Sequence, residues 1–336
     1  MKKLIISLFT VLLMFNSQAF ASNIEILPTM QTKTNVQDRV WVGTFQIVWN
    51  DLMDKFVHGD VKFIGGSPYY VSELNRQEFT VNDISSKSFY KYCGKVKANT
   101  KRTIEKAIKK KFNEKSDILD ALNLTPDKKR YLIYAMLKKD FQFLNAFDKL
   151  GKSSFRDGEA EYFGINNASS EELRKTVKVL FYNSPSDFAV ALQTKDNEEV
   201  FLYKTPNTKT FNFIYQDMMK KANAYEGEKE FGEADLLKVP NLKFDEEKSF
   251  KELTGKRIKG TELVIEDALE TVKFEMNNEG VKLKSEAAIS MMKCSMPIAQ
   301  PRKFYLDDTF VLFLKEADKK TPYFALRVHD ISKFQN

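Results

Sequence analysis

Hydrolytic chemistry most often depends on a histidine beside a nucleophile, and the 336-residue chain contains two histidines, His58 and His329. Neither accompanies a nucleophile-elbow motif of the kind that activates a serine. Zinc requires three or four nitrogen or sulfur ligands, and two histidines with the distant Cys93 and Cys294 give no ligand spacing. The sequence therefore indicates no catalytic residue, metal or cofactor, and it predicts a protein that is not an enzyme.

Basic side chains are densest between Lys95 and Lys115, where nine residues are Lys or Arg. One interpretation is the solvated face of a short helix. The other is a weak contact with an anionic polymer such as a glycan, or with lipid headgroups. Two of the 53 basic residues lie in the leader described below, so the rest of the chain has 51 basic and 46 acidic residues and a net charge of +5. This charge is too small to require a nucleic-acid partner.

The first 21 residues have the three parts of a Sec signal peptide. Two lysines precede the apolar run LIISLFTVLLMF, and the small residues of AFA end the segment. The run is too short to span a bilayer permanently, so we expect no membrane anchor. The mature protein is expected to be exported to the periplasm or the medium. In such an oxidising compartment Cys93 and Cys294 could form one disulfide.

The rest of the chain divides into a polar segment at 22–40, expected to be a flexible lead-in, and one domain at 41–336. Helices are predicted at 42–59, at 103–113 with Thr103 as the cap, and at 212–225. The change from helices to strands along the chain predicts an α+β fold with large mixed or antiparallel sheets and helices concentrated in the N-terminal half. The segments predicted as strands are 131–137, 176–182, 187–195, 199–205, 235–245, 262–268, 271–277, 303–317 and 322–331.

The segment NNEGVKLKSEAAISMMKCSMP, at 277–297, lies between two predicted strands but has no tight-turn chemistry of its own. Before it, Val272, Phe274 and Met276 alternate with charged residues, as in a strand with one buried face. After Gly280 the alternation resumes. One interpretation is a long hairpin of two plain strands. On one face of the resumed pattern lie Val281, Leu283, Ser285 and Ala287.

Four segments of the chain resemble the serpins, the serine protease inhibitor family, in their order and spacing. They are the helix, connection and strand that end in Phe147-Asp148, the strand with Pro240, the strand that ends in Glu279-Gly280, and the C-terminal strand pair at 303–332. The interval from Gly280 to Phe304 is close to the length of the reactive loop of that family. In place of the run of small residues that inhibitory members have after the Glu-Gly pair, this chain has VKLKSE and then two alanines.

The resemblance implies a serpin-like domain whose segment 280–304 is a reactive loop. It implies a suicide-substrate inhibitor of a periplasmic or extracellular serine or cysteine peptidase, in which the cut loop inserts into the main sheet as a new strand. The alternative is a non-inhibitory, serpin-like binding or structural protein of the cell envelope. A monomer is expected in either case. The implied hinge is Glu279, Gly280, Val281, Leu283, Ser285 and Ala287, and the implied scissile region is Lys293, Cys294, Ser295 and Met296.

Overall fold

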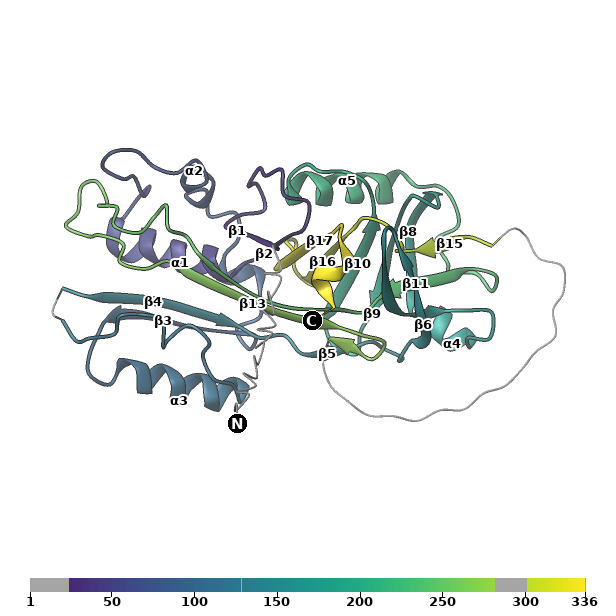
Figure 1. Ribbon diagram of the computed structural model, residues 1–336, viewed down its shortest axis with the longest axis horizontal. Helices are drawn as coiled ribbons and strands as arrows, with labels where there is room; N and C mark the ends of the chain where they lie inside the picture. The colour runs from purple at the N-terminus through teal and green to yellow at the C-terminus, as the bar shows by residue number, and fades with distance from the viewer. Residues whose placement is uncertain (1–23, 128, 282–300, 336) are drawn as a thin grey trace, which may run out of the picture.

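The computed structural model describes residues 24–127, 129–281 and 301–335, and its elements are shown in Figure 1. The largest sheet has seven strands in the order β1-β2-β17-β16-β10-β9-β8, all antiparallel to their neighbours except the parallel pair β1 and β2. The strands are β1 (Glu25–Leu27), β2 (Arg39–Val42), β17 (Phe324–Val328), β16 (Phe310–Glu316), β10 (Glu198–Lys204), β9 (Asp187–Gln193) and β8 (Val177–Ser184).

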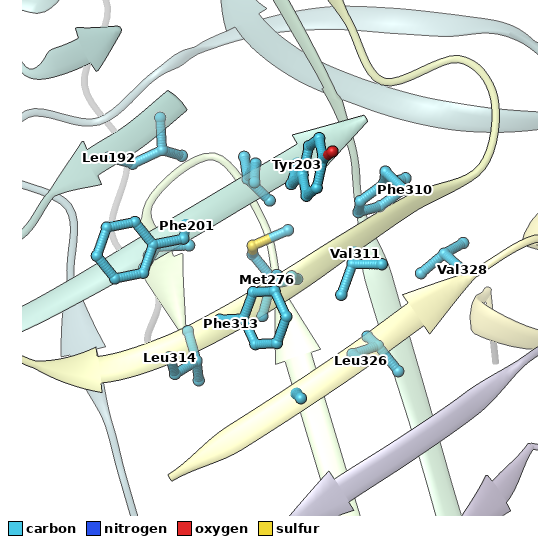
Figure 2. Close-up of a cluster of buried hydrophobic side chains, with 14 of the residues drawn as sticks. Leu192, Phe201, Tyr203, Met276, Phe310, Val311, Phe313, Leu314, Leu326 and Val328 are labelled. Atoms are coloured by element: carbon cyan, nitrogen blue, oxygen red, sulfur yellow. The ribbon is translucent and has the colours of Figure 1, made fainter. Parts of the chain in front are cut away.

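A four-stranded sheet shares its apolar core with the seven-stranded sheet. Its order is β15 (Lys303–Tyr305), β11 (Leu236–Pro240), β7 (Gly158–Ile165) and β6 (Asp148–Phe155), and only β11 and β15 are parallel. The central strands β10 and β16 are buried along their length because both faces of the sheet are covered. Figure 2 shows Met276, from another strand, among the side chains of β10, β16 and β17.

Three two-stranded pairs complete the sheets, and two of them form the site described below. They are β3 (Phe89–Lys95) with β4 (Tyr131–Leu137), β12 (Leu242–Ser249) with β13 (Leu269–Met276), and the short β14 (Gly280–Val281) with β5 (Phe141–Gln142). The helices are α1 (Thr44–Leu52) with a π-helical turn at Met53–Val57, α2 (Val71–Leu74), α3 (Thr100–Phe112), α4 (Glu171–Arg174) and α5 (Phe211–Ala224), with 3-10 turns at Val81–Asp83 and Ile331–Phe334.

The predicted α+β class with mixed sheets is confirmed, but several local predictions are wrong. The described part of the segment at 22–40 is not a flexible lead-in, because Ile24, Ile26 and Leu27 are buried in the main core and β1 pairs with β2. The strand expected at 235–245 is two strands of different sheets, β11 and β12, which are separated at Asn241. The strand expected at 303–317 is likewise divided into β15 of the four-stranded sheet and β16 of the seven-stranded sheet. The segment 262–268 has only an isolated bridge at Val264 rather than a strand.

Candidate functional site: a cleft between two strands

A cleft of 1280 Å³ opens between β4 and β13, and every residue of β4 lines it. Each wall is hydrogen-bonded as a strand on one side only, β4 to β3 and β13 to β12. Among the described residues no ladder joins β4 to β13, so their facing edges have backbone groups that a further strand could pair with. The floor is apolar and comes from α1 and the turn that follows it, with Phe45, Val48, Trp49, Leu52 and Phe56.

At one end of the cleft the walls are joined by β14. After β13 the chain reverses at a bridge between Asn277 and Gly280, and Gly280 and Val281 then pair antiparallel with Gln142 and Phe141. Because β14 is antiparallel to β5 and the chain reverses between β13 and β14, β4 and β13 run in the same direction, as Figure 1 shows. A strand that continued from β14 would run down the cleft antiparallel to both walls.

The predicted hinge residue Gly280 is required by geometry at this end. Its φ of +148° is a conformation that side-chain-bearing residues rarely adopt, and an added Cβ would lie 2.5 Å from the backbone oxygen of Phe141. The carbonyl of Glu279 accepts a hydrogen bond from the N–H of Phe143 at 3.0 Å, which fixes the hinge to the chain after β5. The role of Glu279 and Gly280 as a hinge stays a prediction.

Most of the other predicted loop residues lie outside the described part of the chain. This holds for the inner positions Leu283, Ser285 and Ala287 and for the scissile region of Lys293, Cys294, Ser295 and Met296. Cys93 lies half-buried on β3. Because Cys294 is outside the described residues, the Cys93–Cys294 disulfide stays a prediction.

At the far end, an ion pair bridges the two walls of the cleft. Arg130, just before β4, donates to both carboxylate oxygens of Glu266, just before β13, at 2.8 and 3.1 Å. The side chain of Glu266 is 52% exposed, so solvent screens this pair and it contributes little to stability. A strand entering the cleft would therefore meet little resistance from this contact.

A buried charge cluster fixes the end of β4 nearest the hinge. Lys139 donates to Glu198 at 2.5 Å and also to Glu316, and Tyr323 donates to the second oxygen of Glu198 at 2.8 Å. The backbone N–H of Ser85 donates to both oxygens of Glu316. Burial raises the pKa of Glu198, and Lys139 opposes that rise. The cluster connects the cleft to the seven-stranded sheet through β10 and β16.

A second buried carboxyl lies under the other wall. Glu270, the second residue of β13, is 4% exposed, and its Oε1 accepts a hydrogen bond from the Thr44 hydroxyl of α1 at 2.7 Å. Burial raises the pKa of Glu270 to about 8. Neither Lys139 nor Glu270 was recognised from the sequence. The available signal was a charged residue at a position where the strand pattern demands a buried side chain.

The two histidines have structural contacts. His58 ends the π-helical turn in a left-handed conformation, and His329 Nδ1 lies 2.9 Å from the hydroxyl of Thr309. Burial and the nearby Arg156 and Arg327 lower the pKa of His329. Within the described ranges no group of three metal-ligating side chains is present, and no helix there is long and apolar enough to cross a membrane.

The basic run occupies α3, which lies against the β3–β4 pair (Figure 1). The helix begins at Thr100 rather than at Thr103, whose hydroxyl instead bonds the carbonyl of Asn99. Residues 95–115 contain nine basic and two acidic residues, a net charge of +7 that equals the charge of the whole chain. Four exposed basic residues at a spacing of one helical face have no acidic partner among the described residues: Arg102, Lys106, Lys109 and Lys110.

The strand order and the cleft between β4 and β13 define the class of the protein as an α+β fold with several separate sheets. Comparison with solved structures identifies this architecture as the serpin fold. The chain is similar to the crystal structure of Serpin48, described as a highly specific serpin in the insect Tenebrio molitor, with a TM-score of 0.54 and 11% identity over 90% of this chain and 93% of that chain. The fold that the sequence resemblance implied is therefore confirmed.

Two weaker structural similarities were also found. One is to a thyroxine-binding globulin complex with thyroxine (TM-score 0.48, 12% identity, 89% of this chain and 94% of that chain). The other is to a tumour-suppressing serpin (TM-score 0.47, 12% identity, 85% of this chain and 80% of that chain). No protein-family model matches the chain, and no curated protein matches it at a significant level.

Proposed function

We propose that the protein is an exported suicide-substrate inhibitor of a serine or cysteine peptidase. In this mechanism the peptidase attacks a peptide bond in the segment 280–304 and forms an acyl-enzyme. The freed segment then enters the cleft as a strand between β4 and β13 before water can hydrolyse the acyl bond. The observation that supports this proposal is an unfilled strand position that already has its first two residues in place, as β14.

The register of β14 tells which residues would meet in the inserted state. Counted from the Asn277–Gly280 bridge, positions 283, 285 and 287 would lie beside Phe274, Val272 and Glu270, whose side chains are buried. In the same register along β13, position 291 would lie beside Glu266. In the register of β14 with β5, continued along β4, position 292 would lie beside Arg130. The ion pair between Arg130 and Glu266 therefore marks the end of the open strand position. The inner residues Leu283, Ser285 and Ala287 are uncharged, as a buried strand face requires.

Leu283 is the residue that favours the alternative, a non-inhibitory binding or structural protein with the same fold. It is large for a strand that must enter quickly, and overpacking a dense layer costs about 1–3 kcal/mol. Trapping depends on insertion being faster than hydrolysis of the acyl bond, so a slow insertion converts an inhibitor into a substrate. The test below separates the two functions.

The proposal predicts a large gain in heat stability after a single cut. The protein would be incubated with trypsin, for which Lys293 is a candidate site, and with an elastase-like peptidase. Cleavage between residues 291 and 296 is expected to raise the melting temperature by roughly 20 °C, because about ten new backbone hydrogen bonds at about 1 kcal/mol each would form. An inhibitor would also form a peptidase complex that survives a denaturing gel.

Gly280→Ala provides the matched variant for this experiment. Because its Cβ would collide with the backbone of β5, we expect normal cleavage of the loop but a much smaller gain in melting temperature. A wild-type protein that is cut, gains stability and forms no complex supports the non-inhibitory alternative. Cleavage with no gain in stability in the wild type would contradict strand insertion itself.

We also propose that α3 binds an anionic polymer weakly through Arg102, Lys106, Lys109 and Lys110. The concentration of the net charge in residues 95–115 supports this proposal, because the rest of the chain is neutral as a whole. On dextran sulfate resin, Lys106→Glu/Lys110→Glu should elute at clearly lower salt than the wild type. Lys33→Glu/Lys62→Glu makes the same change in net charge at other exposed lysines and should elute later than the α3 variant. Equal elution of the two variants would contradict a specific surface.

A further inference from the structure

The N-terminus of helix α1 has no capping side chain among its own residues. Its N-cap residue is Gly43, no side chain of that residue bonds the first turn, and the first turn contains no acidic residue. The first N–H groups of a helix need acceptors from outside the helix when its own residues supply none. The carboxyl comes from across the cleft floor, because Glu270 of β13 accepts from the Thr44 hydroxyl and the Phe45 N–H.

This contact joins one wall of the cleft to its floor, but it leaves one oxygen unsatisfied. Oε2 of Glu270 is buried and has no hydrogen-bond partner among the described residues. If the carboxyl group is ionised, its negative charge is buried and only one of its two oxygens accepts hydrogen bonds. If it is protonated, the charge is gone and only one hydroxyl remains unpaired. The protonated form is therefore the one that burial favours.

The surrounding charged groups do not neutralise Glu270. Lys248 lies opposite it on β12, but its ammonium group donates to the carbonyl of Ile26 and lies 3.8 Å from Glu25. On α1, Asp51 is bound by Lys55 and Lys91. On the other wall, the ammonium group of Lys139 is held by Glu198 and Glu316, and Tyr323 bonds Glu198.

We propose that Glu270 is a positioning residue for the cleft: its protonated carboxyl keeps β13 seated on the first turn of α1, and its ionisation releases that wall. In the seated state the carboxyl is buried. In the released state it meets water, where a glutamate has a pKa of about 4.3. The released state therefore holds the proton less tightly. This inference does not require the loop to be cut or inserted.

The sign and size of the effect follow from proton linkage. The pKa of the seated carboxyl is about 8, so the seated state keeps its proton over a range in which the released state has lost it. Between about pH 4.5 and pH 8, each pH unit raises the ratio of released to seated protein about tenfold, and above pH 8 the ratio levels off. The mobility of β13 therefore increases as the medium becomes neutral and then mildly alkaline. Because β13 leads directly to Gly280, this change reaches the start of the segment 280–304.

Hydrogen exchange of the intact, uncut protein tests this proposal, with labelling times adjusted for the intrinsic effect of pH. Peptides covering 44–52 and 269–276 report on the contact, and a peptide covering 310–316 in the central sheet is the internal control. From pH 5.5 to 7.5 we expect the protection of the two reporter peptides to fall about tenfold per pH unit relative to the control. Glu270→Gln should abolish this fall, and Glu275→Gln, on the same strand, should leave it unchanged.

The proposal is overturned if Glu270→Gln shows the same fall as the wild type, or if the wild type shows none. Thr44→Val gives a second test that leaves the carboxyl in place. Loss of the hydroxyl donor raises the pKa of Glu270 further, so the fall in protection should continue above pH 8 in this variant. An upper limit that stays at pH 8 in Thr44→Val would also contradict the proposal.

Discussion

Replacement of Lys139 by methionine is expected to lower the free energy of unfolding by about 3–5 kcal/mol, because it leaves two buried carboxylates without their shared cation. The side chains of Glu198 and Glu316 are only 7% and 4% exposed, so bulk water solvates the two carboxylates poorly once the lysine is gone. Methionine has nearly the same length as the lysine stem, which limits any contribution from a cavity. Urea unfolding at pH 7, followed by circular dichroism, measures the effect.

Lys138→Met is the matched control for this prediction. Lys138 is the preceding residue, and it pairs with Glu114, whose side chain is 45% exposed. An exposed pair of this kind contributes about 0–1 kcal/mol, so the control should remain close to the wild type. The loss in Lys139→Met should also become smaller toward pH 5, since burial already raises the pKa of Glu198 and protonation removes the repulsion between the carboxylates. Equal effects of the two substitutions would contradict the role given to the cluster.

Glu270→Gln is expected to stabilise the protein above neutral pH, by about 2–4 kcal/mol at pH 8.5. The folded-state pKa of about 8 is higher than the unfolded value of about 4.5, so the native protein binds the proton more tightly. The stability from this group is therefore complete below about pH 4.5 and is lost as the pH rises through 8. The amide that replaces the carboxyl carries no charge at any of these pH values, so the variant should lack this loss.

The measurement is the free energy of unfolding from pH 5 to pH 9 for the wild type and two variants. The difference between Glu270→Gln and the wild type should grow with pH, whereas Glu275→Gln should follow the wild-type curve within about 0.5 kcal/mol. A difference that is constant across this range would show that the carboxyl of Glu270 does not titrate in the native protein with a raised pKa.

The sequence was sufficient for the features that depend on local pattern. The alternation of Val272, Phe274 and Met276 predicted β13 and its buried face. The apolar run at 131–137 predicted β4, and the helical spacing at 212–225 predicted α5. In each case the residues of the segment itself define the strand or helical periodicity.

The features that were missed depend on contacts between distant parts of the chain. Lys139 is separated from Glu316 by 177 residues, and Thr44 from Glu270 by 226, so no local pattern connects them. The segment at 22–40 was misjudged because its polar composition hides five apolar residues that pack in the core: Ile24, Ile26, Leu27, Met30 and Val40. The division at Asn241 is a choice between two sheets, which only the tertiary arrangement decides.

The bridge between Asn277 and Gly280 has a kinetic consequence for a cut chain. It makes β14 the closed end of a hairpin, so the loop closure from which a further strand could extend is already made in the intact chain. Strand pairing would then extend residue by residue from β14, and hairpins form within about 1–10 μs. That time is far shorter than the turnover of most enzymes, at about 10 per second. If the proposed insertion occurs, its rate would then depend on how quickly the two walls separate as well as on how Leu283 fits between them, and Lys139 and Glu270 make the buried contacts of those walls.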